Sequence, residues 1–304
     1  MYPPPPQGYG APPPPAAPRR GGLRSLVAII VVVAIVIGGV IAYGVAGFAV
    51  ASSRISNASK ALNTVIDHEN AITKSFNDLA DQLAKINLTS STTAADLKSY
   101  RGLSDQLVST SQAALPTVAT DDASLASAAS SLTEQGWLTA LSKSRLDDAS
   151  SRLRHARKAL SDAKTIAGDY VQLGGYYQTF FDGNIDLTTI GTALSANDLP
   201  AATTATNTLK TDAAKGLALA GAPGLPPEVK EYETDLAKLA DDFAKLLVAV
   251  VRGDTVKGSA LLKTVEAEAT KVDSYDWSAI SDKIDAFYKP LIDDYNTEGH
   301  QATD

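Results

Sequence analysis

The sequence contains no cysteine. This absence excludes disulfide bonds, thiolate metal sites, a cysteine nucleophile and a lipid-modified N-terminal cysteine. It does not indicate a compartment, because an oxidising environment permits disulfides without requiring them.

Motifs for catalysis and cofactor binding are also missing. His68-Glu69 opens like the zinc-protease motif H-E-x-x-H, but Ile72 stands where the second histidine is needed, and the chain has only three histidines. It has no nucleophile-elbow motif, no phosphate-binding loop and no dinucleotide-binding glycine motif. We therefore expect a protein that is not an enzyme and that has no cofactor and no histidine-based metal site.

One short stretch resembles a calcium-binding loop. Asp182, Asn184 and Asp186 match its first three alternating ligands. Leu187 replaces the required turn glycine and Ala193 replaces the bidentate acid, which excludes an EF-hand. A looser calcium site and an Asx turn remain as interpretations, and the turn is the favoured one.

Charge is missing from residues 26–51, an unbroken apolar run of 26 residues. A helix of this length spans about 39 Å, against about 30 Å for the hydrocarbon core of a bilayer. The run therefore predicts one transmembrane helix, over residues 25–51, with the lipid bilayer as its partner.

The flanking charges predict how this helix is oriented. Three arginines lie in the eight residues before Leu26, whereas only Arg54 and Lys60 follow closely. Because cationic flanks tend to stay in the cytoplasm, we expect a single-pass protein of the cell membrane with a cytoplasmic N-terminus and an extracytoplasmic C-terminal domain.

Two export signals compete with this interpretation. Ala49-Val50-Ala51 resembles a signal-peptidase site, and cleavage after Ala51 would give a secreted helical binding protein. Arg19-Arg20 partly resembles a twin-arginine signal but lacks the following aromatic residue. The apolar run is much longer than the roughly 7–15 residues of a signal-peptide core, which favours an anchor.

Small residues recur every four positions in the apolar run, at Ala34, Gly38, Ala42 and Ala46. Such a stripe allows two membrane helices to approach closely, which is compatible with a homo-oligomer. The favoured alternative is that alanine and glycine are simply frequent in membrane helices. Before the run, residues 1–24 hold most of the prolines and predict a disordered cytoplasmic tail.

All 34 acidic residues lie after residue 51, together with 24 of the 27 basic ones, so residues 51–304 carry a net charge of −10. An acidic surface repels phosphate groups. We therefore expect no nucleic-acid binding and little attraction to anionic lipid headgroups.

After the apolar run, apolar residues alternate at spacings of three and four, with Glu69 as the one exception. They are Ile55, Ala58, Leu62, Val65, Ile72, Phe76, Leu79, Leu83 and Ile86. This heptad pattern predicts a helical stalk that continues from the membrane helix. Its seam either pairs with another copy or packs in an intramolecular bundle, and the bundle is preferred because several later helices must also bury an apolar face. Glu69 either sets the register or reaches solvent.

The last part of the chain offers a partner for that seam, because Trp277, Ile280, Ile284, Phe287 and Leu291 show the same spacing. Other helices are predicted from about residue 93 to Ala114, where Pro116 ends the helix, and from about 121 to 172. Further helices are predicted at 186–196, 200–215, 227–252, 255–272 and 277–296. Breaks are predicted at 174–175, 182–184, 197–198, 222–226 and 253–254, where Gly, Pro, Asn and Asp gather.

No segment alternates like a strand, so the predicted fold is all-α, an antiparallel multi-helix bundle. We divide it into a stalk and bundle at 52–184 and a helical-hairpin region at 185–304, packed together as one extracytoplasmic domain. Residues 186–213 and 242–269 align as a faint repeat in which Asp198 matches Asp254. Each copy predicts a helix, a turn and a second helix.

Two groups of side chains are candidate contact sites. Five of the aromatic residues gather within twelve positions: Tyr170, Tyr176, Tyr177, Phe180 and Phe181. They suit a ligand pocket or contact surface, although the core of a bundle end is the favoured interpretation. Arg154, Arg157 and Lys158 form a basic cluster for an anionic partner, and the favoured alternative is a helix exterior neutralised by nearby acids.

These observations give a leading hypothesis of a membrane-anchored, non-enzymatic helical protein that binds or spaces another component of the cell envelope. A second hypothesis is a solute-binding or sensing domain with its ligand near the aromatic residues. The sequence identifies neither the envelope or surface partner nor a ligand.

Overall fold

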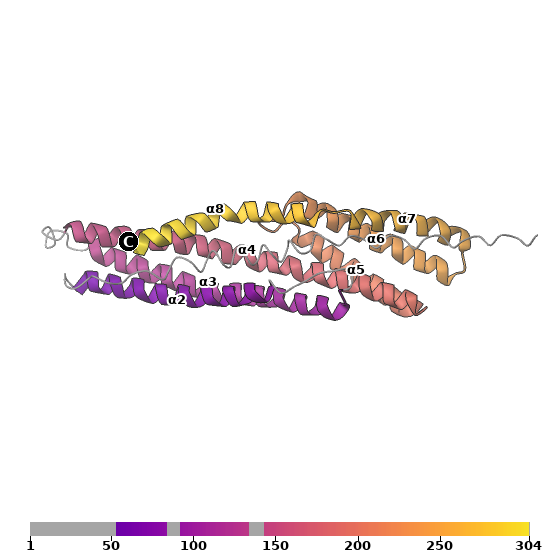
Figure 1. Cartoon of the computed structure of the whole chain (residues 1–304), viewed down its shortest axis with the longest axis horizontal. Coiled ribbons are helices and arrows are strands. Elements are labelled where there is room, and N and C mark those ends of the chain that lie inside the picture. The colour runs from indigo at the N-terminus through magenta and orange to yellow at the C-terminus, as the bar shows by residue number, and fades with distance from the viewer. Residues whose placement is uncertain (1–52, 84–91, 134–142, 304) are drawn as a thin grey trace, which may run out of the picture.

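The structure is a computed structural model that describes residues 53–83, 92–133 and 143–303. Within these residues the chain forms seven helices and no strand, which confirms the predicted all-α class (Figure 1). The helices are α2 (Ser53–Leu83), α3 (Ala94–Thr133), α4 (Lys143–Ser195), α5 (Leu199–Leu219), α6 (Pro227–Val251), α7 (Thr255–Asp273) and α8 (Trp277–Thr303).

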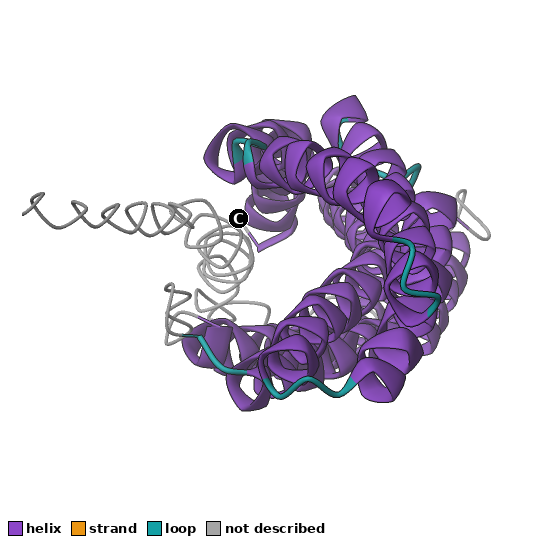
Figure 2. Ribbon diagram, turned by 90° about the vertical axis from the view of Figure 1, so that its right-hand side faces the viewer, coloured by secondary structure: helices purple, strands orange, loops and turns teal. Residues whose placement is uncertain are grey.

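The helices are arranged as an elongated bundle around α4. This helix has 53 residues, which corresponds to about 80 Å, and it runs along most of the molecule (Figure 1). It packs against α2, α3 and α8 in one half and against α5 in the other, where α6 joins α5 and α7 joins α6. Viewed down the long axis, the helices follow a curved path that is open on one side (Figure 2). The predicted division at residue 184 falls inside α4.

The two ends of the bundle carry different parts of the chain. The start of α2 and the end of α8 lie at one end, and the turns between α4 and α5 and between α6 and α7 lie at the other (Figure 1). We call the end with these two turns the tip. The first residue of α2 is therefore far from the tip.

The heptad seam of α2 packs inside the chain. Ile55, Ala58, Leu62 and Val65 are buried in a cluster with side chains of α3 and α4, including Leu125. The preference for an intramolecular bundle is confirmed for the described part of the stalk.

The seam predicted for α8 is right only in its first two turns. Trp277, Ile280 and Ile284 are buried, but Phe287 is 47% exposed and Tyr288 is buried in its place. From Ile284 to Ile292 the buried positions are four apart, and from Ile292 to Glu298 they are three apart. The buried face shifts in this way because a straight helix with 3.6 residues per turn drifts away from a strict heptad pattern.

Pro116 does not end a helix, contrary to prediction, because α3 continues through it to Thr133. Proline removes one backbone donor and usually breaks a helix interior. Here Pro116 is exposed, whereas Ala114 and Val118 on either side are buried. Tertiary packing of the buried face therefore outweighs the local penalty.

The predicted breaks at 174–175 and 182–184 were also wrong, because α4 is continuous from Lys143 to Ser195. Gly174 faces α3, where a Cβ would lie 2.7 Å from a methyl group of Val108. Glycine is present there because the two helices approach closely, and helix propensity alone does not reveal this reason.

The turns predicted at 197–198, 222–226 and 253–254 are confirmed. Both turns of the faint repeat have the same geometry. Asn197 and Gly253 have positive φ angles of 56° and 68°, and the next residue in each turn, Asp198 or Asp254, donates its amide hydrogen to the carbonyl five residues earlier. Each aspartate then caps the following helix, so a Schellman ending and an N-cap share one residue.

The membrane segment at 25–51, its small-residue stripe and the proline-rich tail lie outside the described residues. Across 53–83, 92–133 and 143–303, no helix combines the length and the apolar character that crossing a bilayer requires.

We predict that Gly174→Ala lowers the free energy of unfolding of a fragment of residues 52–304 by about 1–3 kcal/mol, because its methyl group overpacks the α3–α4 contact. Gly175→Ala is the matched control, since a Cβ there meets nothing within 4 Å. It should stabilise α4 by up to about 1 kcal/mol. Urea unfolding of both variants measures the difference, and equal effects would contradict the close approach at Gly174.

Candidate functional site

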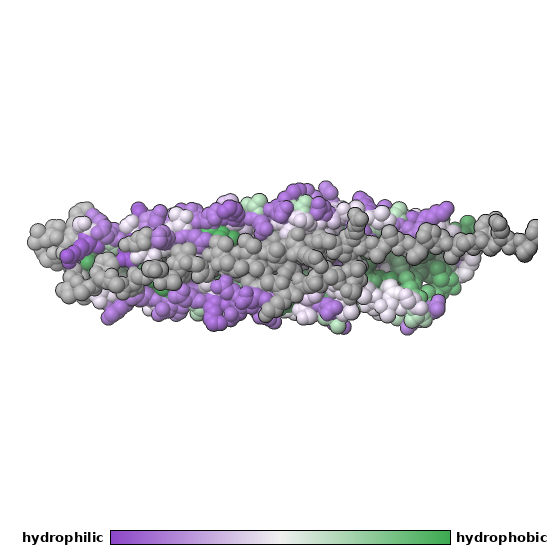
Figure 3. All heavy atoms as spheres, viewed as in Figure 1, coloured by the Kyte–Doolittle hydropathy of each residue, from purple (hydrophilic) through white to green (hydrophobic). Residues whose placement is uncertain are grey.

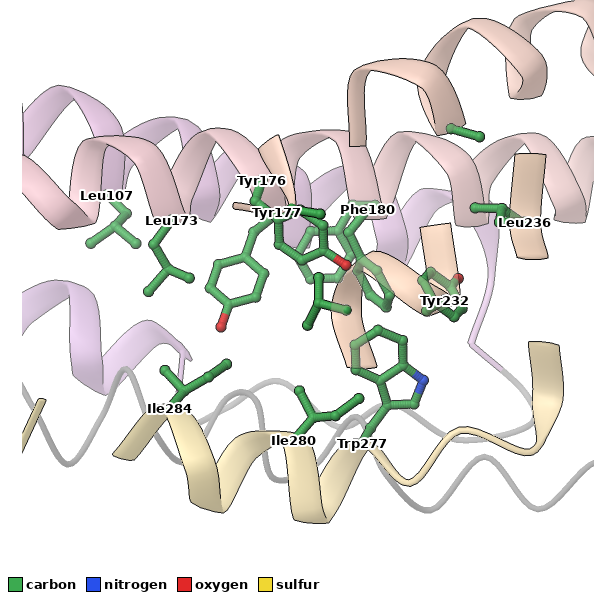
Figure 4. Close-up of a cluster of buried hydrophobic side chains, with 14 of the residues drawn as sticks. Leu107, Leu173, Tyr176, Tyr177, Phe180, Tyr232, Leu236, Trp277, Ile280 and Ile284 are labelled. Carbon is green, nitrogen blue, oxygen red and sulfur yellow. The ribbon is translucent and has the colours of Figure 1, made fainter. Parts of the chain in front are cut away.

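The five clustered aromatic side chains are in the hydrophobic core. Their exposed fractions range from 0 to 8%, for Tyr170, Tyr176, Tyr177, Phe180 and Phe181. Phe180 contacts the rings of Trp277 and Tyr232 edge-on or tilted, at centroid distances of 4.8 and 5.9 Å (Figure 4). The interpretation of the cluster as bundle core is confirmed, and these residues do not form an exposed contact surface.

A buried acid lies beside this core. Glu233 on α6 is 1% exposed, and a Cβ on Gly216 of α5 would clash with its carboxylate, so the missing side chain at Gly216 provides the space for it. Burial raises the pKa of Glu233 to about 8, although the nearby hydroxyl group of Tyr176 opposes the shift. This carboxyl group is enclosed between helices.

Two side chains of the predicted basic cluster form ion pairs with other helices of the bundle. Arg157 binds Asp122 on α3 at 2.7 Å, and Lys158 binds Glu298 on α8 at 2.6 Å. Arg154 is exposed and donates to Ser151 on its own helix. The favoured alternative, a helix exterior neutralised by acids, is therefore confirmed for Arg157 and Lys158.

Neighbouring basic residues of α4 fix the end of α8. Arg152 donates to the backbone carbonyls of Ala302 and Thr303, each at 2.9 Å. His155 lies 2.6 Å from the carboxylate of Glu298. Cations at a helix C-terminus are favourable because the last carbonyls have no partner within the helix.

Glu69 is buried between α2 and α8 and does not reach solvent, so one of its two predicted roles is wrong. It is 5% exposed, and Tyr295 donates a hydrogen bond of 3.0 Å to Oε2. Oε1 is buried without a partner among the described residues. Burial raises the pKa of Glu69 to about 7, an effect that the Tyr295 hydroxyl partly offsets and the negative charge of nearby Asp121 adds to.

Two cavities touch Glu69 and Tyr295, with volumes of about 20 Å³ and 40 Å³. A water molecule needs at least about 10–15 Å³ of such space, whereas pockets for organic ligands are far larger. Glu69 is therefore a structural contact between α2 and α8, and these cavities are too small for a metabolite.

The calcium-like stretch is part of a continuous helix. Asp182 binds Arg101 at 2.7 Å and the amide of Asn184 donates to the carbonyl of Phe180. Burial and the negative charges of Asp212 and Asp182 raise the pKa of Asp186 to about 7. Among the described residues, no group of three or more His, Asp or Glu side chains is arranged to hold a metal ion. An Asx turn is also wrong, because α4 does not turn here.

The tip carries an apolar groove of about 510 Å³ between the α4–α5 hairpin and the α6–α7 hairpin. Figure 3 shows apolar atoms gathered at this end, over α5, α6 and α7, whereas the visible surface of the other half is mostly polar. The groove is lined by Leu194, Leu199, Phe243, Leu246, Leu247, Ala249, Val250, Gly253, Asp254, Thr255, Gly258, Ser259 and Leu262.

Exposed apolar side chains are concentrated at the tip. Seven large hydrophobic side chains of the described residues are exposed, and Phe287 alone lies outside the tip. The other six are Leu194, Val248, Val250, Val251, Val256 and Leu262. Large exposed apolar patches on soluble domains usually mark interaction sites. We therefore take the tip as the candidate functional site.

The sequence pattern does not identify the tip as a contact surface. The residues that form it are ordinary members of helical hairpins, and the repeat pattern alone does not show which apolar faces stay uncovered. The one available signal was the apolar run Leu246–Val251 directly before the predicted turn at Gly253-Asp254.

No known protein family, curated protein or solved structure matches the chain significantly.

We predict that Phe180→Ala lowers the free energy of unfolding by about 3–5 kcal/mol, because it leaves a cavity in the aromatic core. Phe287→Ala is the control at an exposed position and should change stability by about 0.5 kcal/mol or less. Urea unfolding of the fragment of residues 52–304 measures both. Little effect at Phe180 would contradict its role in the core.

We predict that Glu69→Gln stabilises the protein at pH 8 but not at pH 4.5. The folded-state pKa of Glu69 is raised to about 7 from 4.5, so the folded chain keeps a proton that the unfolded chain loses, and stability falls as pH rises between these two values. Gln removes the buried charge, which should add up to about 3 kcal/mol at pH 8. Exposed Asp67 on the same helix supplies the control, Asp67→Asn, for which no such pH-dependent gain is expected.

Proposed function

We propose that this protein is a single-pass membrane protein whose extracytoplasmic helical bundle holds a binding surface, the tip, away from the bilayer. The role is non-enzymatic: the protein binds or spaces another component of the cell envelope. The concentration of exposed apolar side chains at the tip is the observation that carries this proposal.

The geometry of the bundle supports it. The apolar run at 26–51 immediately precedes α2, and α2 begins at the end opposite the tip (Figure 1). An anchor there would project the tip by roughly the length of α4, about 80 Å. A rod of packed helices is suited to holding two components apart, because each helix is supported by a face buried along the common axis.

The internal packing supports a non-enzymatic role. Three acids have strongly raised pKa values. Glu69 and Glu233 are enclosed between helices and have structural neighbours, and Asp186 is half-buried beside the carboxylates of Asp182 and Asp212. A solute-binding role near the aromatic residues has less support, because those side chains fill the core.

We predict that the native protein is held in the membrane by an uncleaved N-terminal segment. The full chain should stay in the membrane pellet after an alkaline carbonate wash, and its intact mass should include the N-terminal tail. Replacing Val33 and Ile35 with Arg should move it to the supernatant or block its insertion, because charges at a bilayer centre are strongly unfavourable. A soluble native chain that begins at Ser52 would instead establish cleavage and overturn the anchor.

A further inference from the structure

We propose that the tip docks onto the surface of an anionic lipid bilayer, so that the rod connects its own membrane to a second one. This inference rests on the proposed membrane anchor and names the component that the tip binds. It depends on the shape, the apolar exposure and the charge of the two turns.

The most exposed apolar side chains stand on the α6–α7 turn. Val251 ends α6 and is 67% exposed, and Val256 is in the first turn of α7 and is 83% exposed. Both flank the turn at Gly253-Asp254, which protrudes at the end of the rod (Figure 1). Apolar side chains on a narrow convex turn can enter the boundary between headgroups and acyl chains without a complementary cavity.

The local charge at the tip differs from that of the whole domain. Residues 187–209 and 246–263 contain only two acids, Asp198 and Asp254, against three basic residues, Arg252, Lys257 and Lys263. Both acids accept hydrogen bonds from backbone amides as N-caps. The three basic side chains make no ion pair with any residue in the described ranges. The tip is therefore locally positive on a domain with a net charge of −10, which matches anionic headgroups.

The same features fit a protein partner less well. A stable protein interface buries about 800 Å² on each side with close shape complementarity, whereas the most exposed side chains of the tip, Val251 and Val256, stand on one short turn that protrudes at the end of the rod. The groove beside Val250 opens at this surface and adds apolar area to it. A bilayer accepts such an uneven apolar and cationic surface because its lipids rearrange around it.

The test uses the full chain, reconstituted into phosphatidylcholine vesicles that are fixed to a surface. Capture of fluorescent, protein-free vesicles is then measured as a function of lipid concentration. The acceptor vesicles contain either phosphatidylcholine alone or an equimolar mixture with phosphatidylglycerol. We expect capture of the anionic vesicles, weaker capture at high salt, and little capture of the neutral vesicles.

Two double variants and matched controls test the residues. Arg252→Gln with Lys257→Gln should weaken capture roughly 25-fold, since each basic residue near an anionic surface contributes about fivefold. Val251→Ser with Val256→Ser should also reduce it by at least about tenfold. Lys98→Gln with Lys230→Gln, two exposed charges outside the tip, and Phe287→Ser should leave it unchanged. Circular dichroism confirms that each variant is folded.

Three results would overturn the inference: no capture, capture that is unchanged in both tip variants, or capture only when the acceptor vesicles also carry the protein. The last result would identify a second copy of the chain as the occupant. Flotation of the donor vesicles is measured first, because loss of the chain from them would contradict the anchor rather than the tip. If the chain is lost from the donor vesicles, flotation of the same variants with anionic vesicles tests the binding of the tip to lipid directly.

Discussion

The structure depends on the packing of one long helix, α4, against partners that change along its length. Its first half is covered by α2, α3 and α8 and its second half by α5. A helix of 53 residues has little stability of its own in water, since most helical stability in proteins comes from burying an apolar face. Gly174 illustrates this dependence on packing, because α4 continues through a glycine at the point where α3 comes too close for a Cβ. The rod shape follows, since every other helix gains its buried surface by lying along α4 or along a helix already docked there.

Buried acids at the helix contacts limit how this packing can vary. Glu69 meets Tyr295 between α2 and α8, and Glu233 occupies the space over Gly216 between α5 and α6. Each costs stability when ionised, because burial raises its pKa to about 7 and about 8 respectively. An apolar side chain would avoid that cost. The hydrogen bond from Tyr295 is available in one register of α8 only, so we interpret Glu69 as favouring that register over slipped ones.

The sequence predicted what depends on local pattern and missed what depends on tertiary contact. The heptad spacing from Ile55 identified the buried face of α2, and the Asn-Asp and Gly-Asp pairs identified two turns whose hydrogen bonds need those residue types. Pro116 and Gly174 were misinterpreted as helix ends, because their local penalties are offset by contacts with other helices. Of the candidate sites, the aromatic and basic clusters were visible as clusters, but only the fold shows that the rings fill the core and that Lys158 binds Glu298. The tip was missed because the exposure of an apolar helix face depends on which helix fails to cover it.

That uncovered face is the strongest reason to assign a role to the tip. Burying a valine contributes about 1.5–3 kcal/mol relative to leaving it in water, and the exposed side chains of Val251 and Val256 gain little of this stabilisation. Exposed apolar side chains also favour aggregation, which polar residues at the same positions would avoid. The hairpin itself does not need them, because its turn is held by the cap from Asp254 and by the positive φ angle of Gly253. The equivalent turn of the first hairpin has the same backbone geometry with Ser195 and Pro200 at the matching positions. Two valines and two cations are therefore specific to the second turn, and this difference between otherwise matching turns favours a binding role for the α6–α7 turn.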